Sequence, residues 1–151
     1  MSSGDSAAPG PHRRRAGPSR PDSVDLDQTF DLTSLHMLRQ TVAAHADRLG
    51  AQGDQVERLI IVAGELATNA IRHGGGRGRL LLWHHDDAVY CQVSDQGPGI
   101  KDPTVGTSPP KPLARDSGGR GLWICRNLAS ELIISTGPNG HGAIVQAVIL
   151  P

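Results

Sequence analysis

Residues 54–73 most constrain how this chain folds, because they have the pattern of one long amphipathic helix closed by glycine. Apolar residues recur at helical spacing, and Gly74-Gly75-Gly76 follows at once, where a helix is expected to end. On a helical wheel one arc is apolar and predicts a face packed on a core. That arc consists of Val56, Leu59, Ala63, Leu66, Ala67 and Ala70. We expect Ile61, Gly64, Thr68 and Arg72 to lie away from that face.

A polar stripe runs beside the apolar arc and is formed by Glu65, Asn69 and His73. Side chains four residues apart are neighbours on a helix, so this spacing predicts one wall of a cleft. The amide oxygen of Asn69 suits Mg²⁺, and Glu65 can accept a proton from an attacking hydroxyl. A boundary helix with incidental polar residues is the alternative. For His73 the alternative is a cation that suits the helix C-terminus without contacting a ligand.

The remaining elements follow from periodicity and from turn residues. The pattern predicts a strand over 26–32 and a helix over 35–49 that ends near Gly50. Hairpins are expected at 79–84 with 88–95, joined by Asp86-Asp87, and at 132–136 with 143–150, with a helix over 122–129 between them. Long helices followed by antiparallel strands predict an α+β fold, a two-layer sandwich with a mixed, mostly antiparallel sheet and helices on one face.

Composition divides the chain into a tail and one domain. Residues 1–25 are rich in Pro, Gly, Ser and Arg with almost no apolar content, so we expect a disordered N-terminal tail. Residues 26–151 are long enough for one core. Residues 96–118 are rich in Pro and Gly without periodicity, and loops of that length are often binding lids.

Charge and hydropathy exclude several classes of protein. Lys+Arg and Asp+Glu each total 15, so no basic face for nucleic acid is indicated. No segment reaches the roughly 20 apolar residues of a membrane span, and no apolar stretch follows Arg13-Arg14-Arg15. We therefore expect a cytoplasmic protein. Cys91 and Cys125 lie in apolar surroundings, which favours free buried thiols, with a disulfide left open.

The strand that ends at Asp95 runs into a turn containing Gly97 and Gly99. A carboxylate in that place can accept a hydrogen bond from the exocyclic amine of a base. Glycine lets the backbone approach such a base without a Cβ in the way. A plain turn is the alternative, because Asp, Gly and Pro are common turn residues.

A second glycine segment, Gly119-Arg120-Gly121, precedes Leu122 at the start of a predicted helix. Free N–H groups at a helix start form an anion site. Arg120 either contacts phosphate through its guanidinium fork or is solvated. The segment is not a Walker A loop, because Gly-Lys-Ser/Thr is missing.

Together, Glu65–Gly74, Asp95–Gly99 and Gly119–Leu122 resemble the three sequence boxes of the GHKL (Bergerat-fold) ATPases. Within that superfamily the chain looks most like the stand-alone anti-sigma-factor serine kinases, over Leu26 to Leu150. The resemblance implies ATP and Mg²⁺, with Glu65 as general base and Asn69 as the Mg²⁺ ligand. The nucleotide-binding residues that it implies are Asn69, His73, Asp95 at the adenine, Gly97, Gly99, Gly119, Arg120, Gly121 and Leu122.

The resemblance also implies an activity and partners. These are ATP-dependent phosphorylation of a serine on an antagonist protein, an anti-anti-sigma protein of STAS type, and sequestration of a sigma factor. A homodimer is a further expectation, whereas nucleic acid and membrane partners are not expected. Ala143 stands where many relatives carry Thr. Two alternatives stay open: a non-catalytic ATP-binding module that captures a transcription regulator, and an ATP-binding fragment serving a separate phosphotransfer protein.

Overall fold

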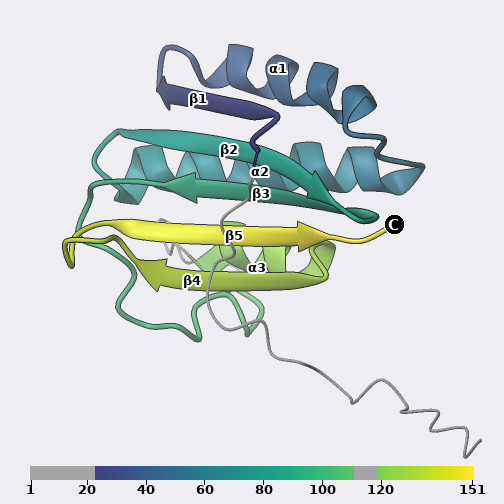
Figure 1. Cartoon of the computed structure of the whole chain (residues 1–151). Helices are drawn as coiled ribbons and strands as arrows, with labels where there is room; N and C mark the ends of the chain where they lie inside the picture. Colours follow the sequence, from purple (N-terminus) through teal and green to yellow (C-terminus); the bar gives the residue numbers. More distant parts are fainter. Residues whose placement is uncertain (1–22, 111–118) are drawn as a thin grey trace, which may run out of the picture.

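The computed structural model describes residues 23–110 and 119–151 and arranges them in two layers (Figure 1). In chain order the elements are β1 (Leu26–Asp31), α1 (Leu35–Arg48), α2 (Asp54–His73), β2 (Arg77–His85), β3 (Ala88–Ser94), α3 (Gly119–Leu128), β4 (Glu131–Thr136) and β5 (Ala143–Ile149). In the view of Figure 1, α2 and α3 lie behind the sheet, and α1 packs beside α2. The predicted α+β sandwich is confirmed.

The five strands follow the order β1-β2-β3-β5-β4, and each neighbouring pair is antiparallel. The sheet is therefore more uniformly antiparallel than the mixed sheet that the sequence predicted. β5 lies between β3 and β4, so Ser94 at the end of β3 pairs with Ile144 at the start of β5. This crossover brings Asp95, the residue after β3, beside Ala143.

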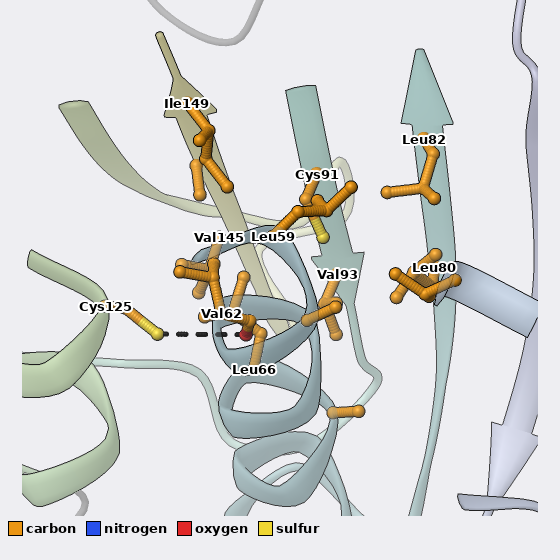
Figure 2. Packing of buried hydrophobic residues seen from close by; sticks show 14 of the residues in the cluster. Leu59, Val62, Leu66, Leu80, Leu82, Cys91, Val93, Cys125, Val145 and Ile149 are labelled. Carbon is orange, nitrogen blue, oxygen red and sulfur yellow. Dashed lines mark hydrogen bonds between the residues drawn. The ribbon is translucent and has the colours of Figure 1, made fainter. Parts of the chain in front are cut away.

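The core lies between the helices and the sheet, with α2 at its centre. Figure 2 shows Leu59, Val62 and Leu66 of α2 packed against residues of β2, β3 and β5. Each fully buried aliphatic side chain contributes about 1.5–3 kcal/mol, so this packing fixes the rotation of α2 about its axis. That rotation decides where the stripe of Glu65, Asn69 and His73 points.

One prediction for α2 is wrong, because the helix is covered on two sides. Gly64 is buried, and a Cβ there would lie 3.1 Å from Nε of Arg39 on α1. The helical wheel predicts that Gly64 lies away from the packed face, whereas α1 packs on that side. Ile61 is exposed as expected, at 46% of its surface.

A buried polar residue at the start of α2 was not predicted. Gln55 is 1% exposed, and its Nε2 donates to the carbonyl oxygens of Asp87, at 3.0 Å, and Ile149, at 2.8 Å. These hydrogen bonds join the first turn of α2 to the β2–β3 hairpin and to the end of β5. They fix the N-terminal end of the helix that carries the polar stripe.

The element boundaries differ from prediction mainly at α3. The helix begins at Gly119 rather than near Leu122, so Gly119-Arg120-Gly121 forms its first turn and not a preceding loop. Residues 1–22 of the predicted tail and 111–118 of the predicted lid lie outside the described residues. Asp25, the last residue of the predicted tail, is hydrogen-bonded to the sheet, because its N–H donates to the carbonyl of Leu82 in β2 at 2.8 Å. Across the described part of the chain, no helix is long and apolar enough to cross a bilayer.

Candidate functional site

A cavity of about 270 Å³ opens between α2, the adjoining ends of β3 and β5, the loop after β3, and α3. It is lined by Leu66, Asn69, Ala70, His73, Val93, Asp95, Gly99, Ile100, Lys101, Asp102, Val105, Leu122, Ala143 and Val145. An apolar pocket with a few polar groups is the usual form of a small-molecule site. The side chains of Asn69 and Asp95 are therefore candidates to orient a ligand.

The second glycine segment meets the polar stripe of α2 beside this cavity. A Cβ on Gly121 would lie 3.0 Å from Oε2 of Glu65 and 3.2 Å from both amide atoms of Asn69. Gly121 is buried, so its missing side chain is what leaves room for those two polar groups. Glu65, Asn69 and Gly121 therefore lie together in the structure.

Asn69 carries a polar atom that nothing in the described residues satisfies. Its Nδ2 is buried and has no hydrogen-bond partner there. Such groups are rare in folded proteins and call for an explanation, of which a ligand is one. The amide can turn to present its oxygen to a cation, so the residue fits a role as a Mg²⁺ ligand.

Among the residues that the structure describes, no group of three or more His, Cys, Asp or Glu side chains could hold a metal ion. A Mg²⁺ ion bound by one or two protein oxygens together with phosphate oxygens and water, which is common for this ion, would need no such group.

Asp95 is held in place by backbone groups. Its Oδ1 accepts hydrogen bonds from the N–H of Gly97, at 2.9 Å, and from the N–H of Ala143, at 3.3 Å. Burial raises the pKa of the Asp95 carboxyl above its ordinary value, and these two donors offset part of that rise. Ala143 thus contacts Asp95 through its backbone N–H.

Glycines allow the backbone to close around Asp95. A Cβ on Gly74 would lie 2.4 Å from Oδ2 of Asp95, and a Cβ on Gly97 would lie 2.6 Å from Cα of Gly74. Gly142 has φ +75°, and a Cβ there would lie 1.9 Å from the Asp95 carbonyl oxygen. Sequence reasoning did not select Gly142 as a site residue. In the sequence, only its position just before the final strand could have indicated such a role.

The other predicted site residues are placed less centrally. His73 and Gly99 line the cavity, although the His73 side chain is largely exposed. Gly119 and the exposed Arg120 lie in the first turn of α3 and are not among the lining residues. Four lining residues belong to the 96–118 loop, whose length and composition favoured a binding lid but singled out none of them. They are Ile100, Lys101, Asp102 and Val105.

Comparison with known proteins decides which family has this fold and cleft. Residues 29–149 match the family described as Histidine kinase-like ATPase domain. The chain belongs to this family. Membership implies that the domain binds ATP.

Curated relatives of this chain are named as an anti-sigma factor and as a serine-protein kinase. This chain is 32% identical to the anti-sigma F factor of Bacillus licheniformis over 108 residues. The aligned part covers 66% of this chain and 73% of that protein. The chain is 26% identical over 124 residues to the serine-protein kinase RsbW of Halalkalibacterium halodurans, covering 75% of each. The chain is thus a distant homologue of anti-sigma-factor kinases.

Solved structures confirm the fold. A chain in the SiaB–SiaC complex from Pseudomonas aeruginosa has a TM-score of 0.60 at 13% identity, covering 83% of this chain and 91% of that one. The mycobacterial sensor histidine kinase MprB has a TM-score of 0.54 at 18% identity, covering 82% and 97%. At these identities the likeness concerns the ATPase fold alone.

Proposed function

We propose that this protein is an ATP-dependent serine/threonine protein kinase of the anti-sigma-factor type. It phosphorylates a serine of a STAS-type antagonist protein. When it is not bound to that antagonist, it holds a sigma factor in the cytoplasm. The observation that carries the proposal is the position of Glu65. Its Oε2 lies against Gly121, one helical turn from Asn69, so a proton acceptor stands beside the predicted phosphate site.

The proposed reaction requires one proton acceptor from the protein, together with the positioning of ATP and of the serine. Glu65 takes the proton of the serine hydroxyl as the oxygen attacks the γ-phosphorus, and the bond between that phosphorus and the β–γ bridging oxygen breaks to leave ADP. Bound Mg²⁺ supplies charge neutralisation for the phosphates. The chain's own part is to bind the base at Asp95, to hold the phosphates near Asn69 and Gly121, and to orient the acceptor.

The curated relatives support this proposal over a purely structural role, because one of them is named a serine-protein kinase. A glutamate at position 65 also favours catalysis, since a side chain that cannot accept a proton would suffice for a module that only binds ATP. A phosphoryl-transfer assay distinguishes the kinase from a non-catalytic module that only binds ATP.

The test compares Glu65→Gln with Glu57→Gln, the same change at an exposed position of the first turn of α2. Labelled ATP is added with a purified STAS-type antagonist from the same genome, and phosphoserine is quantified by mass spectrometry. Removing a general base lowers transfer by roughly 10²–10⁴-fold, so Glu65→Gln should transfer little while it still binds ATP. Glu57→Gln should match the unmodified protein.

Two results would contradict the proposal. Equal transfer by Glu65→Gln and Glu57→Gln would remove Glu65 from the chemistry. ATP binding without any phosphoprotein, while the antagonist or a sigma factor is still bound, would favour the non-catalytic module.

A further inference from the structure

The loop that follows β3 forms a compact turn at one wall of the cavity. Oδ1 of Asp102 accepts hydrogen bonds from the N–H and the hydroxyl of Thr104, at 2.9 Å and 2.6 Å. The N–H of Val105 donates to the carbonyl of Asp102 at 3.2 Å, and the N–H of Thr107 donates to that of Thr104 at 3.1 Å. The turn, residues 100–107, is therefore ordered by its own hydrogen bonds.

This turn is docked on α3 by a close backbone contact. Gly106 has φ +81°, and a Cβ there would lie 2.7 Å from the carbonyl carbon of Leu122 and 2.7 Å from the nitrogen of Trp123. Only glycine allows this approach and this backbone conformation together. Leu122 lines the cavity, so the contact joins the turn to the helix at the site itself.

The turn is also held by one side chain of α3. Nε of Arg126 donates to the carbonyl of Val105 at 2.9 Å, and its Nη2 donates to the carbonyl of Pro103 at 2.9 Å. Both carbonyls belong to irregular backbone, where no sheet or helix supplies donors. The planar guanidinium presents two N–H groups in fixed directions, which suits two carbonyls on successive bends of a turn.

We propose that Arg126 is a positioning residue for the nucleotide. It holds the turn against α3, and the turn in consequence places Ile100, Lys101 and Val105 on the cavity. The inference rests on the proposed ATP site and adds a residue outside the three sequence boxes. A basic residue in the last turn of a helix would ordinarily be explained by the helix dipole, for which lysine serves as well as arginine.

The difference between lysine and arginine provides the test. Arg126→Lys keeps the positive charge and loses the planar guanidinium with its two N–H donors. We compare Arg126→Lys, Arg126→Met and Gly106→Ala, the last of which weakens the same docking from the loop side. The matched control is Arg58→Met. Arg58 on α2 also donates to two carbonyls, those of Leu128, at 3.2 Å, and Leu150. Neither Arg58 nor those two residues lines the cavity.

Two quantities are measured at a temperature where thermal melts show every variant folded. One is amide hydrogen exchange of Val105 and Thr107 in nucleotide-free protein. The other is the Kd for ATP with Mg²⁺. For the three docking variants we expect faster exchange at both amides and a Kd raised about tenfold, the factor that 1.4 kcal/mol of lost positioning would give. In transfer assays KM for ATP should rise more than kcat falls. Arg58→Met should lower the melting temperature and leave exchange and Kd unchanged.

The outcomes separate this inference from the proposed function. If Arg126→Lys has the same amide exchange and the same Kd for ATP as the unmodified protein, the inference is wrong. Faster exchange with an unchanged Kd would overturn the role in nucleotide binding. An unmodified protein that binds no ATP would overturn the proposed function, and exchange without nucleotide would still decide whether Arg126 holds the turn.

Discussion

Gly121 of α3 faces Glu65 of α2 so closely that a Cβ on the glycine would lie 3.0 Å from Oε2 of the glutamate. The same Cβ would lie 3.2 Å from both amide atoms of Asn69. α3 therefore begins directly against the polar stripe of α2. The proposed proton acceptor, the proposed Mg²⁺ ligand and the proposed phosphate site occupy one small volume, which a single methyl group would partly fill.

Gly121→Ala is expected to impair function without unfolding the protein. The added methyl group would meet the flexible ends of Glu65 and Asn69, which can move aside, and alanine favours a helix by about 1 kcal/mol over glycine. The methyl group would shift both side chains by a few tenths of an ångström. Phosphoryl transfer should therefore fall, by less than the roughly hundredfold that 1 Å of misplacement costs. Initial transfer rates and a thermal melt check this.

Gly64→Ala is the matched control for that experiment. It also replaces a buried helical glycine, but there the new Cβ meets only the Arg39 side chain, at 3.1 Å. Transfer should be unchanged. If both variants lose transfer to the same extent, the loss at Gly121 would reflect general helix packing and not the site.

Asp95→Asn should weaken ATP binding. The two backbone N–H groups that now bond Oδ1 would hold the amide oxygen of asparagine, leaving its NH₂ group facing the cavity. A donor would then meet the donor amine of adenine, and an unpaired buried polar group costs about 1–3 kcal/mol, or roughly 5- to 150-fold in Kd. Calorimetric titration with ATP measures this. An unchanged Kd would contradict the assignment of Asp95 to the base.

The same substitution predicts a change in how stability depends on pH. Burial raises the folded-state pKa of Asp95, so the folded protein binds more protons than the unfolded chain between the ordinary and the raised pKa. Stability from this group is then present at low pH and is lost as the pH rises through that window. The loss should be smaller for Asp95→Asn. Urea unfolding of both proteins across the acid range measures the difference, and parallel curves would contradict the prediction.

Sequence periodicity predicted α2 to the residue, because an apolar arc, a polar stripe and a glycine stop all agreed over 54–73. It also predicted that Glu65 and Asn69 share one side of the helix, since that depends only on local geometry. It failed for Gly64 and Gln55, whose surroundings come from α1 and from Asp87 and Ile149. Nothing local distinguishes such residues from exposed ones.

The unpredicted parts of the site depend on the order of strands in the sheet. Gly142 contacts Asp95 because β5 lies beside β3, and periodicity gives strands without their order. Arg126 reaches Val105 because the turn at residues 100–107 packs on α3. Strand order and loop conformation are set by tertiary packing, so these two residues could be assigned only from the structure.

The two cysteines should be unreactive in the folded protein. Both are free and buried, and burial raises the pKa of Cys91 to about 12 and that of Cys125 further still. The Cys125 thiol also donates to the carbonyl of Val62 at 3.8 Å (Figure 2). A disulfide-exchange reagent at neutral pH should label neither thiol before unfolding and both afterwards, because the thiolate is the reactive form. Rapid labelling of either thiol in the native protein would contradict this.

Asp86→Gly is expected to stabilise the β2–β3 hairpin. Asp86 has φ +54°, a conformation that costs a residue with a side chain about 1 kcal/mol and glycine very little. Part of that gain is offset by the entropy of glycine in the unfolded chain, so we expect an increase of about 0.5 kcal/mol in the free energy of unfolding. Asp87→Gly removes the same charge without relieving a positive φ and should be destabilising. Chemical denaturation of both variants tests this, and equal effects would point to charge instead.

The central claim is that this cleft binds ATP with a Mg²⁺ ion held by Asn69. The most direct test is calorimetric titration of ATP with Mg²⁺ and with EDTA, into the unmodified protein and Asn69→Ala. We predict that Mg²⁺ tightens binding by about tenfold or more in the unmodified protein and has little effect in the variant. The melting temperature of Asn69→Ala should be unchanged or higher, because the amide nitrogen that it removes is buried without a partner in the described part of the chain. The same Mg²⁺ effect in both proteins, or no ATP binding by either, would contradict the account.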